Sequence, residues 1–212
     1  MPQALKIPPD KLIARLDFYN NSIMLYILEK NLITAQHVSP EDVAASLLSV
    51  AQLFTGMLPP NTLWYTRKEL HAETAIYVSP GKHRVAVVTK PLEPPERFMI
   101  PMPGLVFICS SGQPPKVFAV KERPETMECP VYGAPLFNVY SDGRTCNGTH
   151  QYNENVSKIP EEFFTCFFSL TTFNKFSKSH PDSLYNLWKE LEGKDKYPLD
   201  DLVQAGKIKD II

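Results

Sequence analysis

One stretch of the chain, Pro135–Thr149, combines residue types that can carry out acyl-transfer chemistry. It begins as an apolar extended segment, turns at Ser141-Asp142-Gly143, and carries Cys146 just beyond the turn. Asp and Gly accept the backbone conformations that a tight reversal requires. A cysteine thiolate is a good nucleophile, and an asparagine amide can donate a hydrogen bond to a developing oxyanion. The pattern therefore suggests Cys146 as a nucleophile and Asn138 as an oxyanion donor.

The other three cysteines are weaker candidates for chemistry. Cys109 lies in an apolar strand-like segment and Cys166 lies among phenylalanines, so we expect both to be buried as small hydrophobic residues. Cys129 lies in an irregular segment and is left unassigned. Cys146 alone has mainly polar neighbours, which favours an exposed thiol.

Familiar cofactor and metal motifs are absent from the sequence. It contains no G-x-G-x-x-G, no Walker-type G-x-x-x-x-G-K and no H-E-x-x-H. Cys129, Cys146 and His150 lack the paired spacing that is typical of zinc ligands. We therefore expect no metal site and no organic cofactor in the chain itself.

Composition narrows the class of protein. The 212 residues include 22 basic and 23 acidic side chains, so there is no electrostatic argument for nucleic acid or an anionic membrane surface. No apolar run approaches the ~20 residues of a membrane span. The first residues lack a secretory signal pattern, and the four cysteines are sparse and widely spaced. These features predict a reduced, cytoplasmic protein.

The elements that must position the loop predict an α+β fold. Short connections between the strands in the middle of the chain favour an antiparallel meander rather than a parallel sheet. We expect residues 1–38 to form an N-terminal strand extension packed on the core, and residues 39–212 to form one domain with C-terminal helices. The predicted strands are 12–18, 23–29, 31–38, 62–67, 75–78, 84–89, 104–109 and 116–121, and the predicted helices are 39–56, 161–173, 182–192 and 198–205.

The segment from Asn138 to Cys146 resembles the active-site signature of ubiquitin-conjugating enzymes. In that signature His-Pro-Asn is followed by an apolar residue, a short turn, Gly, two residues and Cys. Here Asn138 stands eight residues before Cys146, and Gly143 stands three before it. The order of helix, meander, irregular lead-in, cysteine loop and helices also resembles the UBC-like fold. The N-terminal strands and the length are more similar to a bacterial UBC-like family, PRTRC system protein B or prokaryotic UBC-like family D.

The resemblance implies a carrier that accepts a ubiquitin-like protein as a thioester on Cys146. The donor would be a ThiF-like activating enzyme, which consumes the ATP, and the acyl group would pass to an acceptor. A JAB-type peptidase is a further partner that the family suggests. Asn138 would either donate to the oxyanion or brace the loop that positions it.

Four further residues are expected to support the loop: Gly143, Asp142, Tyr140 and His150. Gly143 would meet a conformational requirement. Asp142 would lower the pKa of an incoming lysine or simply form the turn. His150 would deprotonate the incoming nucleophile or be a solvated loop histidine.

The sequence departs from the signature on both sides of the loop. Leu136-Phe137 replaces the His-Pro before Asn138, and Asn147-Gly148 replaces the apolar residues usual after the cysteine. One alternative is therefore a non-catalytic UBC-like module that binds a ubiquitin-like protein or its activating enzyme. Another is a cysteine hydrolase, for which the sequence supplies no convincing histidine partner or orienting acid.

Overall fold

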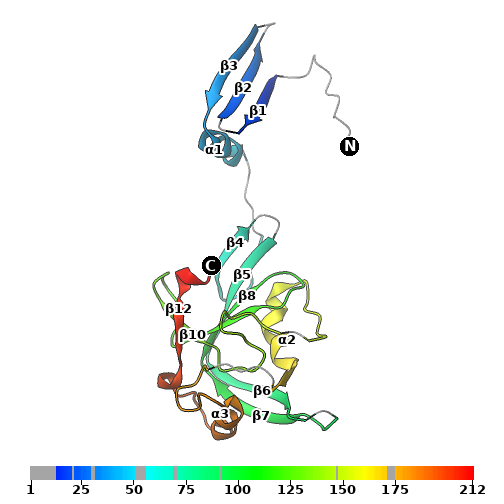
Figure 1. Ribbon diagram of the computed structural model, residues 1–212, viewed down its shortest axis with the longest axis vertical. Coiled ribbons are helices and arrows are strands. Elements are labelled where there is room, and N and C mark those ends of the chain that lie inside the picture. The colour runs from blue at the N-terminus through cyan, green and yellow to red at the C-terminus, as the bar shows by residue number, and fades with distance from the viewer. Residues whose placement is uncertain are drawn as a thin grey trace. The chain divides into compact units, whose positions relative to one another are not determined.

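The chain divides into two compact units, Met1–Gly56 and Met57–Ile212, which are described separately. The computed structural model shown in Figure 1 describes residues 13–20, 22–29, 32–50, 56–68, 71–90, 92–146, 148–170 and 175–212. Some predicted features, the end of the first helix at 51–55 and Asn147 among them, lie outside these residues.

The first unit contains an antiparallel sheet in the order β1-β2-β3, followed by helix α1. The strands are β1 (Ala14–Tyr19), β2 (Ser22–Glu29) and β3 (Leu32–Val38), and the helix is α1 (Pro40–Val50). Ser39 followed by Pro40 is a typical start of a helix in the sequence, and the Ser39 hydroxyl oxygen accepts a hydrogen bond from the Asp42 backbone N–H at 3.0 Å as the N-cap. The described strands and the start of α1 thus agree with the sequence prediction.

The compact unit ends at Gly56, so α1 groups with the first three strands. The sequence predicts a main domain that starts at residue 39 and includes α1, and that boundary stays a prediction. The packing of the N-terminal extension on the core stays a prediction.

The second unit is built on a six-stranded antiparallel sheet in the order β12-β10-β9-β8-β5-β4 (Figure 1). Strand β8 has every residue buried, because other strands flank it and both faces of the sheet are covered at this point. The strands are β4 (Thr62–Lys68), β5 (His71–Val78), β8 (Gly104–Cys109), β9 (Lys116–Val120), β10 (Pro130–Gly133) and β12 (Gln204–Lys207).

A second sheet of three strands has the order β11-β6-β7. Strand β6 (Gly81–Val88) pairs antiparallel with β7 (Glu96–Met102) and parallel with β11 (Phe167–Ser169). The sequence analysis missed β7, which contains Pro101. A proline is tolerated there because β7 is an edge strand, where one side of the backbone needs no hydrogen-bonding partner in the sheet.

Alternating residues of the six-stranded sheet build a hydrophobic cluster on each face. Phe107 of β8 and Val117 of β9 point into the larger cluster, together with residues from β6, β7 and the helices. Val106 and Phe118, on the same two strands, point into the smaller cluster, which Ile208 helps to close. The larger cluster therefore ties the two sheets and the helices of this unit into one core.

Two helices of the second unit lie against the smaller sheet. Helix α3 (Leu184–Leu191) matches the helix that the sequence predicts, and its N-cap is the Ser183 hydroxyl, which accepts from the Asn186 N–H at 3.2 Å. Helix α2 (Ile159–Thr165) follows a short 3₁₀ turn, η2 (Val156–Lys158), and is much shorter than predicted.

The predicted helix 161–173 is wrong beyond Thr165. Cys166 has an extended backbone, and Phe167–Ser169 form β11 because they pair with the edge of β6. Phe168 is 1% exposed whereas Phe167 is 60% exposed, which is the alternation of a strand. The run of phenylalanines was misread as a buried helix, and the rest of its predicted span, 171–173, lies outside the described residues.

The C-terminal segment also differs from the prediction of a helix over 198–205. A 3₁₀ turn, η3 (Leu199–Asp201), is followed by β12, which pairs with β10. A last 3₁₀ turn is η4 (Ile208–Asp210). The chain is thus a mixed α+β protein with largely antiparallel sheets, in agreement with the predicted α+β class. No helix in the described part of the chain is long and apolar enough to cross a membrane.

Candidate functional site: the Cys146 cleft

The loop from Asn138 to Cys146 is a tight hairpin held by its own backbone. Val139 and Thr145 pair antiparallel, and the Cys146 N–H donates to the Asn138 carbonyl at 2.7 Å. The Gly143 N–H donates to the Tyr140 carbonyl at 2.9 Å and closes the turn. The predicted reversal at Asp142-Gly143 is confirmed, and it brings Asn138 beside Cys146.

A glycine is required at position 143. Its φ is +80°, which residues with a side chain rarely adopt, and an added Cβ would lie 2.4 Å from the Phe118 ring. The close approach lets the Gly143 carbonyl accept the Val117 N–H at 2.8 Å. The hairpin is therefore docked directly on β9.

Two polar side chains fix the rest of the loop. The Thr145 hydroxyl is buried and donates to the Pro115 carbonyl at 2.7 Å. The Asp142 carboxylate accepts from the Arg144 backbone N–H at 3.1 Å and from its guanidinium at 2.6 Å. Partial burial alone would raise the pKa of Asp142, but these bonds from Arg144 outweigh it and lower the pKa. The geometry thus favours Asp142 as a turn residue.

Cys146 is exposed and opens onto a cleft of about 630 Å³. One wall is the Asn138–Cys146 hairpin with the residues that follow it, and the other is the end of α2 with β11. The lining residues are Asn138, Cys146, Gly148, Thr149, His150, Gln151, Thr165, Cys166, Phe167 and Ser169. A cleft of this size beside an exposed thiol has room for a peptide tail or a second reactant.

Asn138 joins the two walls of this cleft. Its side chain is buried, its Nδ2 donates to the Phe167 carbonyl at 3.4 Å, and its Oδ1 accepts the Ser169 N–H at 3.2 Å. A side-chain amide offers the same donor and acceptor as a peptide group, so Asn138 pairs with the edge of β11 as a further strand would. This contact favours the bracing role among the two roles that the sequence suggested.

Of the two remaining predicted residues, His150 lines the cleft and Tyr140 does not. His150 is half-buried and packs edge-on against the Tyr152 ring with centroids 4.6 Å apart. Tyr140 is 46% exposed and contributes to the loop through its backbone, which bonds to Arg144 and Gly143.

Cys166 was expected to be buried and inert, but it lines the same cleft as Cys146. Its thiol is half-buried, lies 3.9 Å from the Tyr152 hydroxyl and donates to the Glu162 carbonyl at 3.5 Å. Burial is the main cause of its raised pKa. Cys109 is fully buried as predicted, and burial raises the pKa of its thiol to about 12.

Sequence reasoning missed the β11 side of the site. Phe167 and Ser169 reach Asn138 across about thirty residues of sequence, and no local pattern marks that pairing. Cys129 does not line the cleft; a hydrogen bond from the Thr126 hydroxyl is the main cause of its lowered pKa. Among the described residues, no group of three His, Cys, Asp or Glu side chains is arranged to hold a metal ion.

A comparison of the sequence with known families identifies the class of protein. The sequence matches the family model of prokaryotic E2 family D over residues 42–205, which is most of the chain. The chain therefore belongs to prokaryotic E2 family D, a prokaryotic family of E2-like proteins. No curated protein and no solved structure matches the chain.

Proposed function

We propose that the chain is a conjugating enzyme that carries a ubiquitin-like protein as a thioester on Cys146. The observation that carries the proposal is the exposed Cys146 thiol in a cleft beside Asn138, in a chain of a prokaryotic E2 family. The E2-like family suggests a conjugation-related role and interaction with a ubiquitin-like protein or its activating enzyme.

The first step would be an exchange of thioesters. The Cys146 thiolate attacks the carbonyl of the thioester on the activating enzyme, a new C–S bond forms, and the enzyme's cysteine leaves as a thiolate. In the second step an acceptor nucleophile attacks the thioester carbonyl on Cys146, whose sulfur then leaves as a thiolate. The negative charge that develops on the carbonyl oxygen requires a hydrogen-bond donor nearby.

Asn138 would act mainly as the brace between the two cleft walls. One amide hydrogen is directed to the Phe167 carbonyl, so the second is the one left for an oxyanion. His150 lines the cleft and would be the base for an incoming nucleophile. Gly143 and Asp142 would fix the hairpin rather than take part in chemistry.

We also propose the partner proteins and the cellular compartment of the reaction. The activating enzyme would be ThiF-like and would use the ATP, a JAB-type peptidase would act in the same pathway, and the protein would work in the cytoplasm. Within the bacterial E2-like proteins the chain would correspond to PRTRC system protein B.

Reconstitution tests the proposal directly. The chain is incubated with ATP, a ThiF-like activating enzyme and the ubiquitin-like protein encoded beside it, and its intact mass is measured with and without a thiol reductant. We expect a reductant-sensitive adduct on the wild type and on Cys166→Ala, and no adduct on Cys146→Ala. If an active partner pair leaves the wild type unmodified, the non-catalytic binding module becomes the better account.

A further inference from the structure

The root of the Cys146 hairpin rests on one buried tryptophan of α3. The Trp188 indole N–H donates to the Pro135 carbonyl at 3.0 Å, three residues before Asn138. The same indole packs edge-on against Phe137, with ring centroids 4.7 Å apart. Trp188 is fully buried and Phe137 is 4% exposed, so neither ring has room to rearrange freely.

Trp188 also reaches the opposite wall of the cleft. Its ring lies edge-on to Phe168, with centroids 5.7 Å apart. Phe168 sits between Phe167 and Ser169, the two residues whose backbone groups bond to the Asn138 amide. Trp188 thus contacts Phe137, which precedes Asn138, and Phe168, which lies between the two hydrogen-bonding partners of Asn138.

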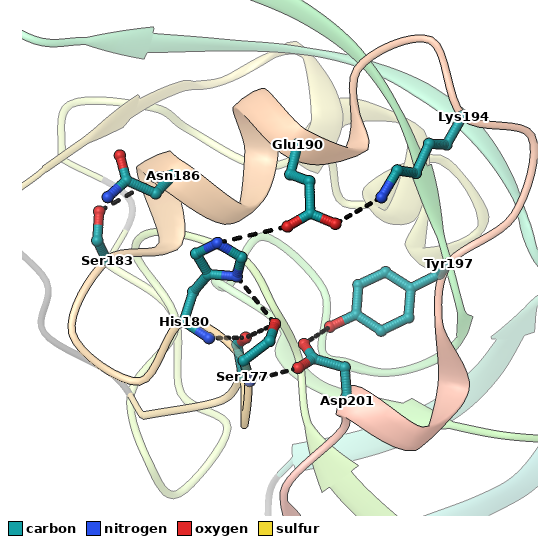
Figure 2. Close-up of polar contacts among 9 residues, drawn as sticks. Ser177, His180, Ser183, Asn186, Glu190, Lys194, Tyr197 and Asp201 are labelled. Atoms are coloured by element: carbon teal, nitrogen blue, oxygen red, sulfur yellow. Dashed lines mark hydrogen bonds and ion pairs between the residues drawn. The ribbon is translucent and has the colours of Figure 1, made fainter.

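Polar contacts connect helix α3 to the segments that precede and follow it in the sequence. The His180 ring lies 3.5 Å from the Glu190 carboxylate of α3, and Glu190 also pairs with Lys194 (Figure 2). The buried Asp201 carboxylate accepts from the Ser179 backbone N–H at 2.7 Å and from the Tyr197 hydroxyl at 3.1 Å. These contacts link α3 and the segments on both sides of it, which limits how far Trp188 can shift.

Asn138 has a φ of +63°, in the left-handed region. Asparagine enters this region more readily than most residues with a side chain, but the conformation still costs free energy that the surrounding contacts offset. The sequence also has Leu136-Phe137 where the active-site signature of ubiquitin-conjugating enzymes has His-Pro. The contact of Phe137 with Trp188 supplies rigidity at that point.

We infer that Trp188 is the positioning residue of the Cys146 cleft, holding Phe137 and Phe168 so that the Asn138 amide keeps its pairing with β11. Trp188 touches no reacting atom and acts through Asn138. The kinetic part of this inference rests on the proposed function, whereas the structural part does not.

The experiment compares Phe137→Leu and Trp188→Phe with Phe98→Leu. Phe98 is a matched control because it also packs edge-on against Trp188, with centroids 6.0 Å apart, but from β7 and away from the hairpin. Hydrogen exchange at the Ser169 amide, which bonds to Asn138, is measured at equal global stability by adjusting urea for each variant. We expect exchange about tenfold faster in Phe137→Leu and Trp188→Phe, and unchanged in Phe98→Leu.

The kinetic arm measures charging of Cys146 as a function of the concentration of charged activating enzyme. We expect Phe137→Leu and Trp188→Phe to lower kcat about tenfold or more with KM unchanged, because a small misplacement of reacting groups is costly. Equal losses in Phe98→Leu, or no change at Ser169 in Phe137→Leu, would overturn the inference. If the wild type takes no acyl group, the proposed function fails while the exchange result still decides the role of Trp188.

Discussion

The two walls of the cleft are held in different ways. The Asn138–Cys146 hairpin is fixed mainly by hydrogen bonds within nine residues and by Gly143 against Phe118. The α2–β11 wall is fixed by pairing with β6, about eighty residues away in sequence, and by the packing of Phe168. The difference is chemical as well, because Cys146 is exposed whereas burial raises the pKa of Cys166. This contrast favours Cys146, on the first wall, as the nucleophile that we propose.

The largest expected effect separates the two cysteines of the cleft. Cys146→Ala should abolish the adduct with the ubiquitin-like protein, because Cys146 is the exposed thiol of the cleft whereas Cys166 is half-buried. Cys166→Ala should keep at least about half of the wild-type rate of charging. Gel analysis without reductant measures both. Equal loss in the two variants would contradict the contrast between the walls.

Thiol labelling should rank the reactivity of the four cysteines in the absence of any partner protein. At pH 8 a thiol with a pKa of about 12, as for Cys109, has only about 10⁻⁴ of its molecules ionised. We expect iodoacetamide to modify Cys146 and Cys129 before Cys166, and Cys109 last, as followed by peptide mass spectrometry. Denatured protein, in which all four should react alike, is the control. Early modification of Cys166 would mean that its wall is more open than described.

Gly143→Ala should disturb the docking of the Asn138–Cys146 hairpin on β9 and lower the free energy of unfolding. A side chain at a left-handed backbone costs about 1–2 kcal/mol, and over-packing against Phe118 adds about 1–3 kcal/mol. Gly112→Ala is the matched control, since φ there is +66° but nothing lies within 4 Å of the added Cβ. Urea unfolding should show a loss that is larger at 143 than at 112. Similar losses would argue against docking of the hairpin on β9.

Asn138→Gly should uncouple the two walls. It removes the hydrogen bonds to Phe167 and Ser169 while tolerating the positive φ, so we expect a loss of about 1–2 kcal/mol in the free energy of unfolding. Asn138→Asp keeps an acceptor for the Ser169 N–H but sets a buried carboxylate oxygen against the Phe167 carbonyl oxygen, so it should lose at least as much stability at neutral pH. A fully stable Asn138→Gly would leave Asn138 without the bracing role.

The smallest effect concerns Asp142, whose charge pair with Arg144 is exposed. Asp142→Asn should cost less than about 1 kcal/mol at pH 7. Because the pKa of Asp142 is lowered in the folded state, its contribution is present above the ordinary carboxyl pKa and disappears as pH falls through the lowered value. Thermal melts of both proteins should therefore converge at low pH. A stability difference between the two proteins that grows as the pH falls would contradict the lowered pKa of Asp142.

The sequence predicted those parts of the site whose causes are local. The Asp142-Gly143 turn, the exposed Cys146 and the Ser39 cap all depend on residues within a few positions of one another. Strand β11 and the place of Cys166 in the cleft depend on the distant edge of β6, which no local pattern shows. Strand β7 was not predicted; Pro101 argues against a strand there unless the strand is known to lie at an edge.

The most direct test of the central claim is the chemistry of the bond formed at position 146. Cys146→Ser is incubated with ATP, the activating enzyme and the ubiquitin-like protein, and the adduct is exposed to a thiol reductant at neutral pH. A serine would hold the acyl group as an ester, so we predict an adduct that resists the reductant but is cleaved by hydroxide. A reductant-sensitive adduct on Cys146→Ser would show that another cysteine is the carrier and would contradict the account.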